Sequence, residues 1–305
     1  MTLRRLLAGT LIAAAGISCA ARQPAPVERD VNEHRTEVER WRAQREERLR
    51  RDDGWLTLVG LSWLLPGENR FGTGPGNRVA LPEGTAPADV GSFDLKDGKV
   101  SVRVSPGADV THDGKPVAEM VLQSDAAGSP TVLQLGSLKF HVIERGDRFG
   151  VRVKDSQAMA LREFTGMENF PIDPAWRVTA RFEPYAPPRR ITVPNVTGEP
   201  TQETVPGALI FEKGGKSFRL EPVAEEGSEE LFIIFGDETN GHETYGAGRF
   251  LYAPQPDSAG QVILDFNRAY NPPCVFTPYA TCPLPPPQNK LALRIAAGEK
   301  SFRDH

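Results

Sequence analysis

The chain has 305 residues, of which 29 are glycine and 27 are proline, so long helices should be a minority of the structure. Hydrophobic residues make up 39% and charged residues 25%, which excludes a disordered chain and fits one large domain or two smaller ones. The formal charge is −4, so the chain lacks the basic excess that binds phosphates, and we expect no nucleic-acid partner.

Residues 1–18 have the pattern of a secretory signal peptide. Arg4 and Arg5 precede an apolar run from Leu6 to Ile17, which is too short to serve as a permanent membrane span. The sequence therefore predicts an exported protein.

The segment Gly16-Ile-Ser-Cys19 resembles a bacterial lipobox, although Gly16 stands where leucine is usual. The resemblance implies lipidation of Cys19, with residues 19–29 as the lipidated N-terminus and linker. It also implies a periplasmic or cell-surface lipoprotein whose partner is the membrane, reached through acyl chains. Cleavage after Ala20 or Ala21 is the alternative.

Residues 30–53 predict an amphipathic helix. Val31, Val38, Trp41 and Leu49 form a narrow apolar stripe, and Asp30 suits the N-cap position. We expect the many Glu and Arg side chains of this segment to be mostly solvated and to have no function of their own.

After Gly54 the pattern changes to short apolar runs separated by turn dipeptides, which predicts a mainly β fold. We expect a β-sandwich over residues 54–156 and a second antiparallel β barrel or half-barrel over 157–305, with the boundary between Gln157 and Trp176. The expected strands cover residues 55–65, 78–81, 99–104, 132–135, 138–143, 149–153, 177–182, 190–193, 208–212, 217–220, 230–235, 249–252, 261–266 and 290–295.

Four segments carry a resemblance to the bacterial and archaeal family called domain of unknown function 1684. They are Gly54–Leu65, Gly67–Gly72, Glu243–Leu251 and, most specifically, Asp265–Asn289. The resemblance extends from about Trp41 to the C-terminus and implies no particular activity.

The first β unit is also loosely similar to forkhead-associated β-sandwiches, in Gly67–Leu81 and in the turn His112-Asp-Gly-Lys115. The arginine and Ser-x-x-His elements that bind phosphothreonine in that family have no counterpart near Val90–Phe93. The resemblance therefore implies the fold of the sandwich and not its phosphopeptide binding.

The C-terminal third carries the predicted ligand site. Seven prolines lie between Pro272 and Pro287, so residues 271–289 should cross the surface as a stiff extended strap. We expect the strap to close a pocket lined by polar and aromatic side chains, namely Glu243, Tyr245, Arg249, Asp265, Asn267, Tyr270, Asn271 and Tyr279. In a purely architectural alternative, Arg249 and Asp265 form a buried ion pair that fixes the strap.

Cys274 and Cys282 are candidates for a disulfide in an oxidising compartment, with two buried thiols as the alternative. The five histidines are dispersed, so we expect no metal site and no cofactor. Only His242 has several acidic neighbours.

These features predict a cell-envelope protein that binds a small-molecule or protein ligand or acts as a scaffold. One alternative is a hydrolase-like enzyme that uses Glu243, Asp265 or His242 as acid or base. Another is a protein-interaction module that uses the sandwich loops.

Overall fold

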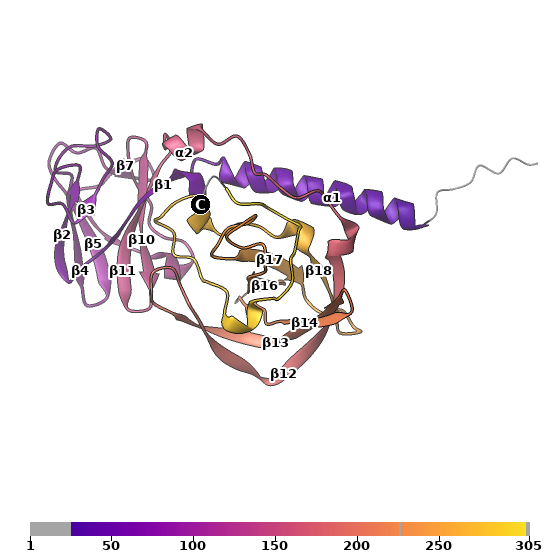
Figure 1. Ribbon diagram of the computed structural model, residues 1–305. Helices are drawn as coiled ribbons and strands as arrows, with labels where there is room; N and C mark the ends of the chain where they lie inside the picture. The colour runs from indigo at the N-terminus through magenta and orange to yellow at the C-terminus, as the bar shows by residue number, and fades with distance from the viewer. Residues whose placement is uncertain (1–25, 226, 303–305) are drawn as a thin grey trace, which may run out of the picture.

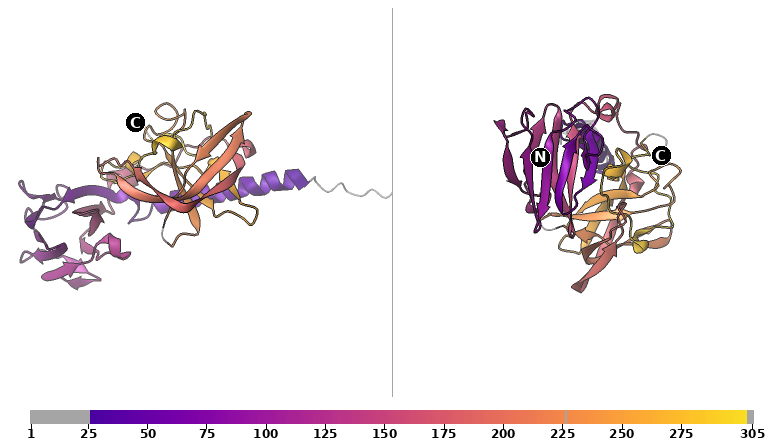
Figure 2. Two further views of the ribbon diagram at one scale, coloured as in Figure 1. Left: turned by 90° about the horizontal axis from the view of Figure 1, so that it is seen from below. Right: turned by 90° about the vertical axis from the view of Figure 1, so that its left-hand side faces the viewer.

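In the computed structural model, residues 26–225 and 227–302 are described (Figure 1). They form a mainly β molecule with one long N-terminal helix, as predicted. The expected signal peptide and Cys19 lie outside the described residues. Within these residues, no helix is long and apolar enough to cross a membrane. The first group of strands lies at one end of the molecule, and the helix runs along the second group (Figures 1 and 2).

Helix α1 spans Pro26–Leu49, so it begins and ends earlier than the predicted segment 30–53. Val38 and Leu49 are fully buried, and Trp41 is half-buried. His34 and Arg45 are also buried, with 5% and 8% of their surfaces exposed. Arg45 is therefore an exception to the expectation that the Glu and Arg side chains of this helix are mostly solvated.

These two polar residues fix the helix to the second group of strands. His34 Nε2 lies 2.8 Å from Asp265 Oδ2. Arg45 Nε donates to Glu299 Oε1 over 3.2 Å, and its Nη2 donates to the carbonyl of Asn271 over 3.0 Å. Removing one partner of a buried pair is costly because the other is left unpaired. The contacts therefore specify where the helix docks.

The first unit is a sandwich of two sheets. One sheet has the spatial order β1 (Leu58–Trp63), β11 (Arg148–Asp155), β10 (Leu138–Arg145), β9 (Leu133–Leu135), β6 (Thr111–His112) and β7 (Lys115–Pro116). The other has the order β3 (Val79–Ala80), β2 (Gly67–Gly72), β4 (Gly91–Lys96), β5 (Lys99–Val104) and β8 (Glu119–Leu122). All pairs are antiparallel except β2 with β3. Phe71, Phe93 and Phe140 meet between the sheets, with ring centroids 4.6 to 6.2 Å apart.

The C-terminal unit also contains two sheets over a shared core. One has the order β14 (Lys216–Leu220), β13 (Thr201–Lys213), β12 (Arg177–Val193) and β18 (Gln261–Asp265), and the other β15 (Val223–Ala224), β16 (Glu230–Phe235) and β17 (Arg249–Pro254). Phe266 lies at the centre, within 6.2 Å of the rings of Trp176, Phe211 and Phe235. The described strands form no closed barrel, so this unit is an open two-sheet arrangement.

The chain between the strands adds short turns of helix. They are α2 (Met159–Arg162) and single 3-10 turns at Trp55–Thr57, Asp125–Ala127, Pro174–Trp176, Phe266–Arg268, Pro273–Val275 and Pro287–Asn289. The expected strand at 290–295 is not formed. Only Lys290 makes an isolated bridge, to Gly236, and the backbone of Ile295 serves instead as a partner for buried side chains.

The strap, residues 271–289, has no regular strand, and its prolines leave few donors for a sheet. Buried amides hold its two ends. Asn271 donates its backbone N–H to Glu299 Oε2 over 2.7 Å, and Asn289 Nδ2 donates to the carbonyls of Glu221 and Ile234 over 2.9 Å each. The strap is therefore fixed by side chains rather than by a ladder.

His141 in β10 should make the stability of the protein depend on pH. Burial, and then the positive charges of Arg152 and Lys154, lower the pKa of His141 from 6.5 to about 4. Below pH 6.5 the unfolded chain binds a proton that the folded chain does not. The full stability is therefore present above pH 6.5, and it declines as the pH falls from 6.5 toward 4.

We expect His141→Gln to flatten this dependence by up to about 2 kcal/mol between pH 6.5 and 5. Denaturant unfolding at several pH values measures it. His242→Gln, at an exposed loop position, is the matched control. Equal slopes for the wild type and His141→Gln would contradict the prediction.

Candidate functional site

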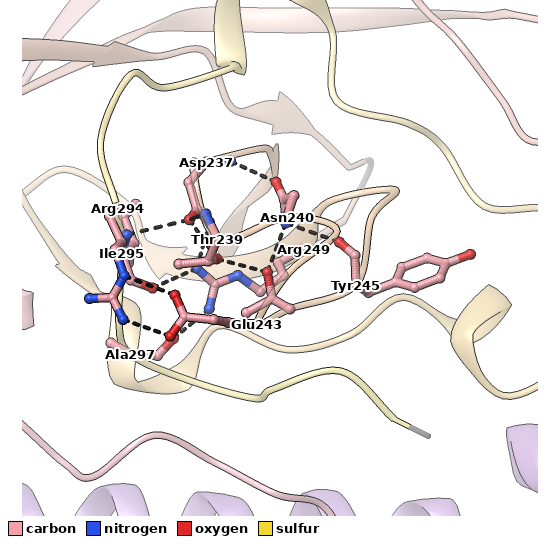
Figure 3. Close-up of polar contacts among 10 residues, drawn as sticks. Asp237, Thr239, Asn240, Glu243, Tyr245, Arg249, Arg294, Ile295 and Ala297 are labelled. Carbon is pink, nitrogen blue, oxygen red and sulfur yellow. Dashed lines mark hydrogen bonds and ion pairs between the residues drawn. The ribbon is translucent and has the colours of Figure 1, made fainter. Parts of the chain in front are cut away.

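The eight residues predicted to line one pocket lie in several different environments. Arg249 and Glu243 belong to a polar network in the loop between β16 and β17 (Figure 3). Asp265, Asn267 and Asn271 hold the helix and the strap. Tyr245 and Tyr279 line one pocket, and Tyr270 lines another.

Arg249 and Asp237 form the fully buried centre of the network, and both side chains are 0% exposed. Arg249 Nη2 donates to Asp237 Oδ2 over 2.5 Å, and Nη1 and Nη2 donate to the carbonyls of Ala297 and Ile295 over 2.5 and 3.0 Å. Burial lowers the pKa of the Arg249 guanidinium, and the Asp237 charge opposes that shift. The architectural alternative named Asp265 as the partner of Arg249. That pairing is wrong, since Asp265 contacts His34 instead.

The other carboxylate oxygen of Asp237 and its backbone N–H also have hydrogen-bond partners. Its Oδ1 accepts hydrogen bonds from the N–H and hydroxyl of Thr239 over 2.8 and 2.6 Å. Asn240 Oδ1 accepts from the Asp237 N–H over 2.7 Å. A groove of about 620 Å³ lies over this loop, lined mainly by glycine, alanine, leucine and proline. Apart from Arg249 Nε, which has no hydrogen-bond partner within the described residues, the side-chain polar atoms of Arg249 and Asp237 beneath the groove are paired, so the network mainly stabilises the loop.

Gly248 allows the strap to approach this loop. Its φ is +92°, and a Cβ atom there would lie 2.4 Å from Pro285 Cγ and 2.7 Å from the Phe235 carbonyl oxygen. A side chain would therefore both strain the backbone and displace the strap.

Glu243 lies at the rim of the network, where Arg294 binds it with two hydrogen bonds of 2.8 and 2.6 Å (Figure 3). The hydrogen bond from Arg294 lowers the pKa of Glu243. The carboxylate is therefore held in its charged form, which suits a positioning role better than that of a general acid.

Asp265, Asn267 and Asn271 are buried and committed to structural contacts. Asn267 exchanges two hydrogen bonds of 2.9 Å with the backbone of Asp173 and donates to Asp265 Oδ1 over 2.9 Å. Asn271 Nδ2 donates to the carbonyl of Lys300 over 2.7 Å. These residues connect the second unit with the helix and the C-terminal segment.

Tyr245 and Tyr279 meet in a pocket of about 540 Å³ between the strap and the sandwich, here called the strap pocket. Trp63 of β1 and Arg148 of β11 form its sandwich side, with the guanidinium carbon of Arg148 4.0 Å from the Trp63 ring centroid. Figure 3 shows the Tyr245 ring pointing away from the Asp237 network. Cys274 is a further lining residue.

Cys274 and Cys282 are free thiols in the structure, and no disulfide joins them. They are nevertheless adjacent, since the Cys274 N–H donates to Cys282 Sγ over 3.1 Å. Their pairing in an oxidising compartment stays a prediction.

Tyr270 contributes to a different pocket, of about 450 Å³, between α1 and the C-terminal unit, here called the helix pocket. Three arginines, three aromatic residues and one glutamate line it: Arg45, Arg48, Arg268, Trp41, Tyr252, Tyr270 and Glu230. Three lining residues are positively charged and one is negatively charged, and Arg45 and Arg268 are also ion-paired with carboxylates outside the lining, namely Glu299, Glu37 and Asp265.

The aromatic rings of the helix pocket are held against each other and against Arg45. The rings of Tyr252 and Tyr270 are nearly parallel, at 12°, with centroids 6.3 Å apart, and the Trp41 centroid lies 6.1 Å from that of Tyr270. The guanidinium carbon of Arg45 lies 4.8 Å from the Tyr270 centroid, which is a cation–π contact. The three rings and the Arg45 guanidinium therefore form one continuous set of contacts.

Burial raises the pKa of both tyrosines, that of Tyr252 to about 12 with a contribution from the nearby Glu225. Both hydroxyls therefore stay protonated at neutral pH. The Tyr252 hydroxyl donates to Glu225 Oε2 over 3.2 Å.

The three arginines differ in how many hydrogen bonds their guanidinium groups already make within the protein. Arg45 bonds to Glu299 and to the Asn271 carbonyl, and Arg268 donates to Glu37 over 3.1 Å. The side chain of Arg48 is exposed, and its guanidinium has neither a hydrogen bond nor an ion pair within residues 26–225 and 227–302. Arg48 is therefore available to a ligand.

Trp41, Arg45 and Arg48 were not among the predicted site residues, because a charge-rich helix usually presents its charges to solvent. A signal was present, since His34, Val38, Trp41, Arg45 and Leu49 follow each other at intervals of three or four residues. Polar residues inside an apolar helical stripe indicate a buried polar contact.

The described part of the chain contains no group of three or more His, Cys, Asp or Glu side chains placed to hold a metal ion. His242 is exposed in the loop beside Glu243.

The described residues form a two-unit β protein with a docked N-terminal helix. The second unit is similar to a known protein family. The model of the family described as "Protein of unknown function (DUF1684)" matches residues 162–300. The resemblance seen in Glu243–Leu251 and Asp265–Asn289 is therefore confirmed, whereas Gly54–Leu65 and Gly67–Gly72 lie outside the match.

One similar solved structure is the solution NMR structure of an uncharacterized protein of Haloarcula marismortui. It is 29% identical, the match covers 47% of this chain and 80% of that chain, and the TM-score is 0.40. A comparison with curated proteins gives no match.

The Arg249–Asp237 pair provides a test of its structural role. We expect Arg249→Met and Asp237→Asn each to lower the free energy of unfolding by about 3–5 kcal/mol, because each leaves a buried group unpaired. The double variant should lose clearly less than the sum of the two. Chemical denaturation measures all four states, and strictly additive losses would show that the pair is not coupled.

Proposed function

We propose that this chain is an exported, lipid-anchored protein of the cell envelope that binds an anionic small molecule in the helix pocket. The observation that carries the proposal is the meeting of three arginines and three aromatic rings around one cavity of about 450 Å³. Cavities of this size suit ligands of a few hundred daltons.

The charges favour an anion. Arg48 has its full donor set available, and Arg45 is held rigidly by Glu299, Asn271 and the Tyr270 ring. A guanidinium binds carboxylate, sulfonate or phosphate groups through paired hydrogen bonds, and a rigid one loses little side-chain entropy on binding. Glu230 at the same pocket disfavours a second negative group near it.

The aromatic walls favour a ligand with an apolar or planar part. Trp41, Tyr252 and Tyr270 present ring surfaces to the cavity, and ring faces bury apolar area while leaving polar groups free to bond. The expected ligand therefore combines one anionic group with an apolar or aromatic body.

The test uses two probes that differ by one anionic group, 8-anilinonaphthalene-1-sulfonate and the uncharged N-phenyl-1-naphthylamine. We expect the sulfonate to bind more tightly and its affinity to fall as ionic strength rises. Arg48→Ala should weaken the sulfonate about fivefold to tenfold and leave the uncharged probe unchanged, as measured by isothermal titration calorimetry.

Arg40→Ala is the matched control, because Arg40 is an exposed arginine of the same helix that does not line the pocket. Equal affinity for the two probes would contradict the proposal, as would equal losses in Arg40→Ala and Arg48→Ala.

The anchor is tested separately. We expect the native protein in the membrane fraction, with an intact mass that shows cleavage before Cys19 and acylation of that residue. Cys19→Ser should move it to the soluble fraction, whereas Cys274→Ser should not. An unacylated chain that begins after Ala20 or Ala21 would overturn this part of the proposal.

A further inference from the structure

The two cysteines of the strap differ sharply in their surroundings. Cys274 is half-buried and is one of the residues that line the strap pocket. Cys282 is 3% exposed and lies behind it. One cysteine therefore lines a cavity, and the other is buried next to the first.

The contacts around Cys274 favour its thiolate. The side chains of Cys282 and Tyr245 each form a hydrogen bond with it, and these two bonds lower the pKa of Cys274 against the effect of burial. The hydrogen bond with the Cys274 side chain, and then burial, raise the pKa of Cys282. The other groups near the pair are Arg148 and Tyr279 in the pocket wall and Arg152 on the side of Cys282.

This asymmetry matches the two roles of an exchanging thiol pair. The attacking thiol must be accessible and partly ionised, and the second thiol must lie close enough to displace the first product. The eight-residue separation along the strap and the 3.1 Å contact between the Cys274 N–H and Cys282 Sγ keep the second sulfur within reach.

We propose that Cys274 and Cys282 form a thiol–disulfide exchange site whose substrate is a low-molecular-weight disulfide bound in the strap pocket. The Cys274 thiolate attacks one sulfur of the substrate disulfide, forming a mixed disulfide and releasing one thiolate, which takes up a proton. Cys282 then loses its proton and attacks Cys274 Sγ, releasing the second thiol. The protein dithiol is oxidised to a disulfide, and the substrate is reduced to two thiols.

This inference does not depend on the helix pocket, which is lined by other residues. It also assigns the candidate disulfide a chemical role, since a disulfide formed by exchange can be reduced again.

The experiment treats the reduced full-length protein with oxidised glutathione and follows each cysteine by peptide mass spectrometry. We expect Cys282→Ser to accumulate the mixed disulfide at Cys274, and the wild type to form the internal disulfide without a retained adduct. Cys274→Ser should give no adduct at Cys282 in the folded state. In the wild type, iodoacetamide should alkylate Cys274 at least tenfold faster than Cys282, and this comparison needs no variant to fold.

Tyr245→Phe and Tyr279→Phe separate exchange chemistry from mere accessibility. Both tyrosines line the pocket, but only Tyr245 forms the hydrogen bond with Cys274 named above. We expect the pH profile of Cys274 alkylation to move to higher pH in Tyr245→Phe and to stay in place in Tyr279→Phe.

Equal alkylation of the two cysteines would overturn the proposal. So would a wild-type disulfide that dithiothreitol reduces only after unfolding, because such a bond would be a permanent structural link.

Discussion

The contacts of the buried Arg45 side chain hold the N-terminal helix, the strap and the C-terminal segment together. Its guanidinium bonds to Glu299 near the C-terminus, bonds to the carbonyl of Asn271 at the start of the strap, and lies over the ring of Tyr270. One side chain thus connects the N-terminal helix, the strap and the last segment of the chain. Because a buried arginine needs all of these partners at once, it fixes their relative positions more narrowly than an apolar contact would.

The strap shows how a segment without regular hydrogen bonding is held in one conformation. Its prolines reduce the number of conformations available to the unfolded chain, which lowers the entropy cost of ordering it. Asn271 and Asn289 then fix its ends through buried amide contacts, and Gly248 leaves space for Pro285 between them. Cys274, Pro278, Tyr279 and Ala280 of the strap line the strap pocket, so this part of its wall needs little ordering when a ligand binds.

Much of the fold could be predicted from the sequence because strand signals are local. Alternating apolar residues and turn dipeptides identify strands such as β5 and β10 without knowledge of their partners. The run Lys290–Ile295 misled the prediction because its apolar residues are buried by the core beside the 236–238 loop rather than by a sheet. Periodicity reports burial and does not state what covers the residue.

The candidate site was harder, since its members are brought together only by tertiary contacts. The clustering of tyrosines predicted one common pocket, whereas Tyr270 lines one cavity and Tyr245 and Tyr279 line another. The sequence also offered Arg249 and Asp265 as partners, because both are charged residues near the strap. In the fold, Arg249 instead forms a salt bridge with Asp237, and Asp265 contacts His34. Each of these pairs joins residues whose separation in the sequence carries no periodic signal.

The ionisation of the carboxylates bears on where chemistry can occur. A general acid needs a carboxyl group whose neutral form is favoured, and Glu243 has the opposite surroundings because Arg294 binds it at two oxygens. Cys274 differs from Glu243 in that its hydrogen bonds stabilise a nucleophilic form at the wall of a cavity. The C-terminal unit therefore uses its carboxylates mainly to hold the structure together, and the proposed reactive group in it is the Cys274 thiol rather than a carboxyl group.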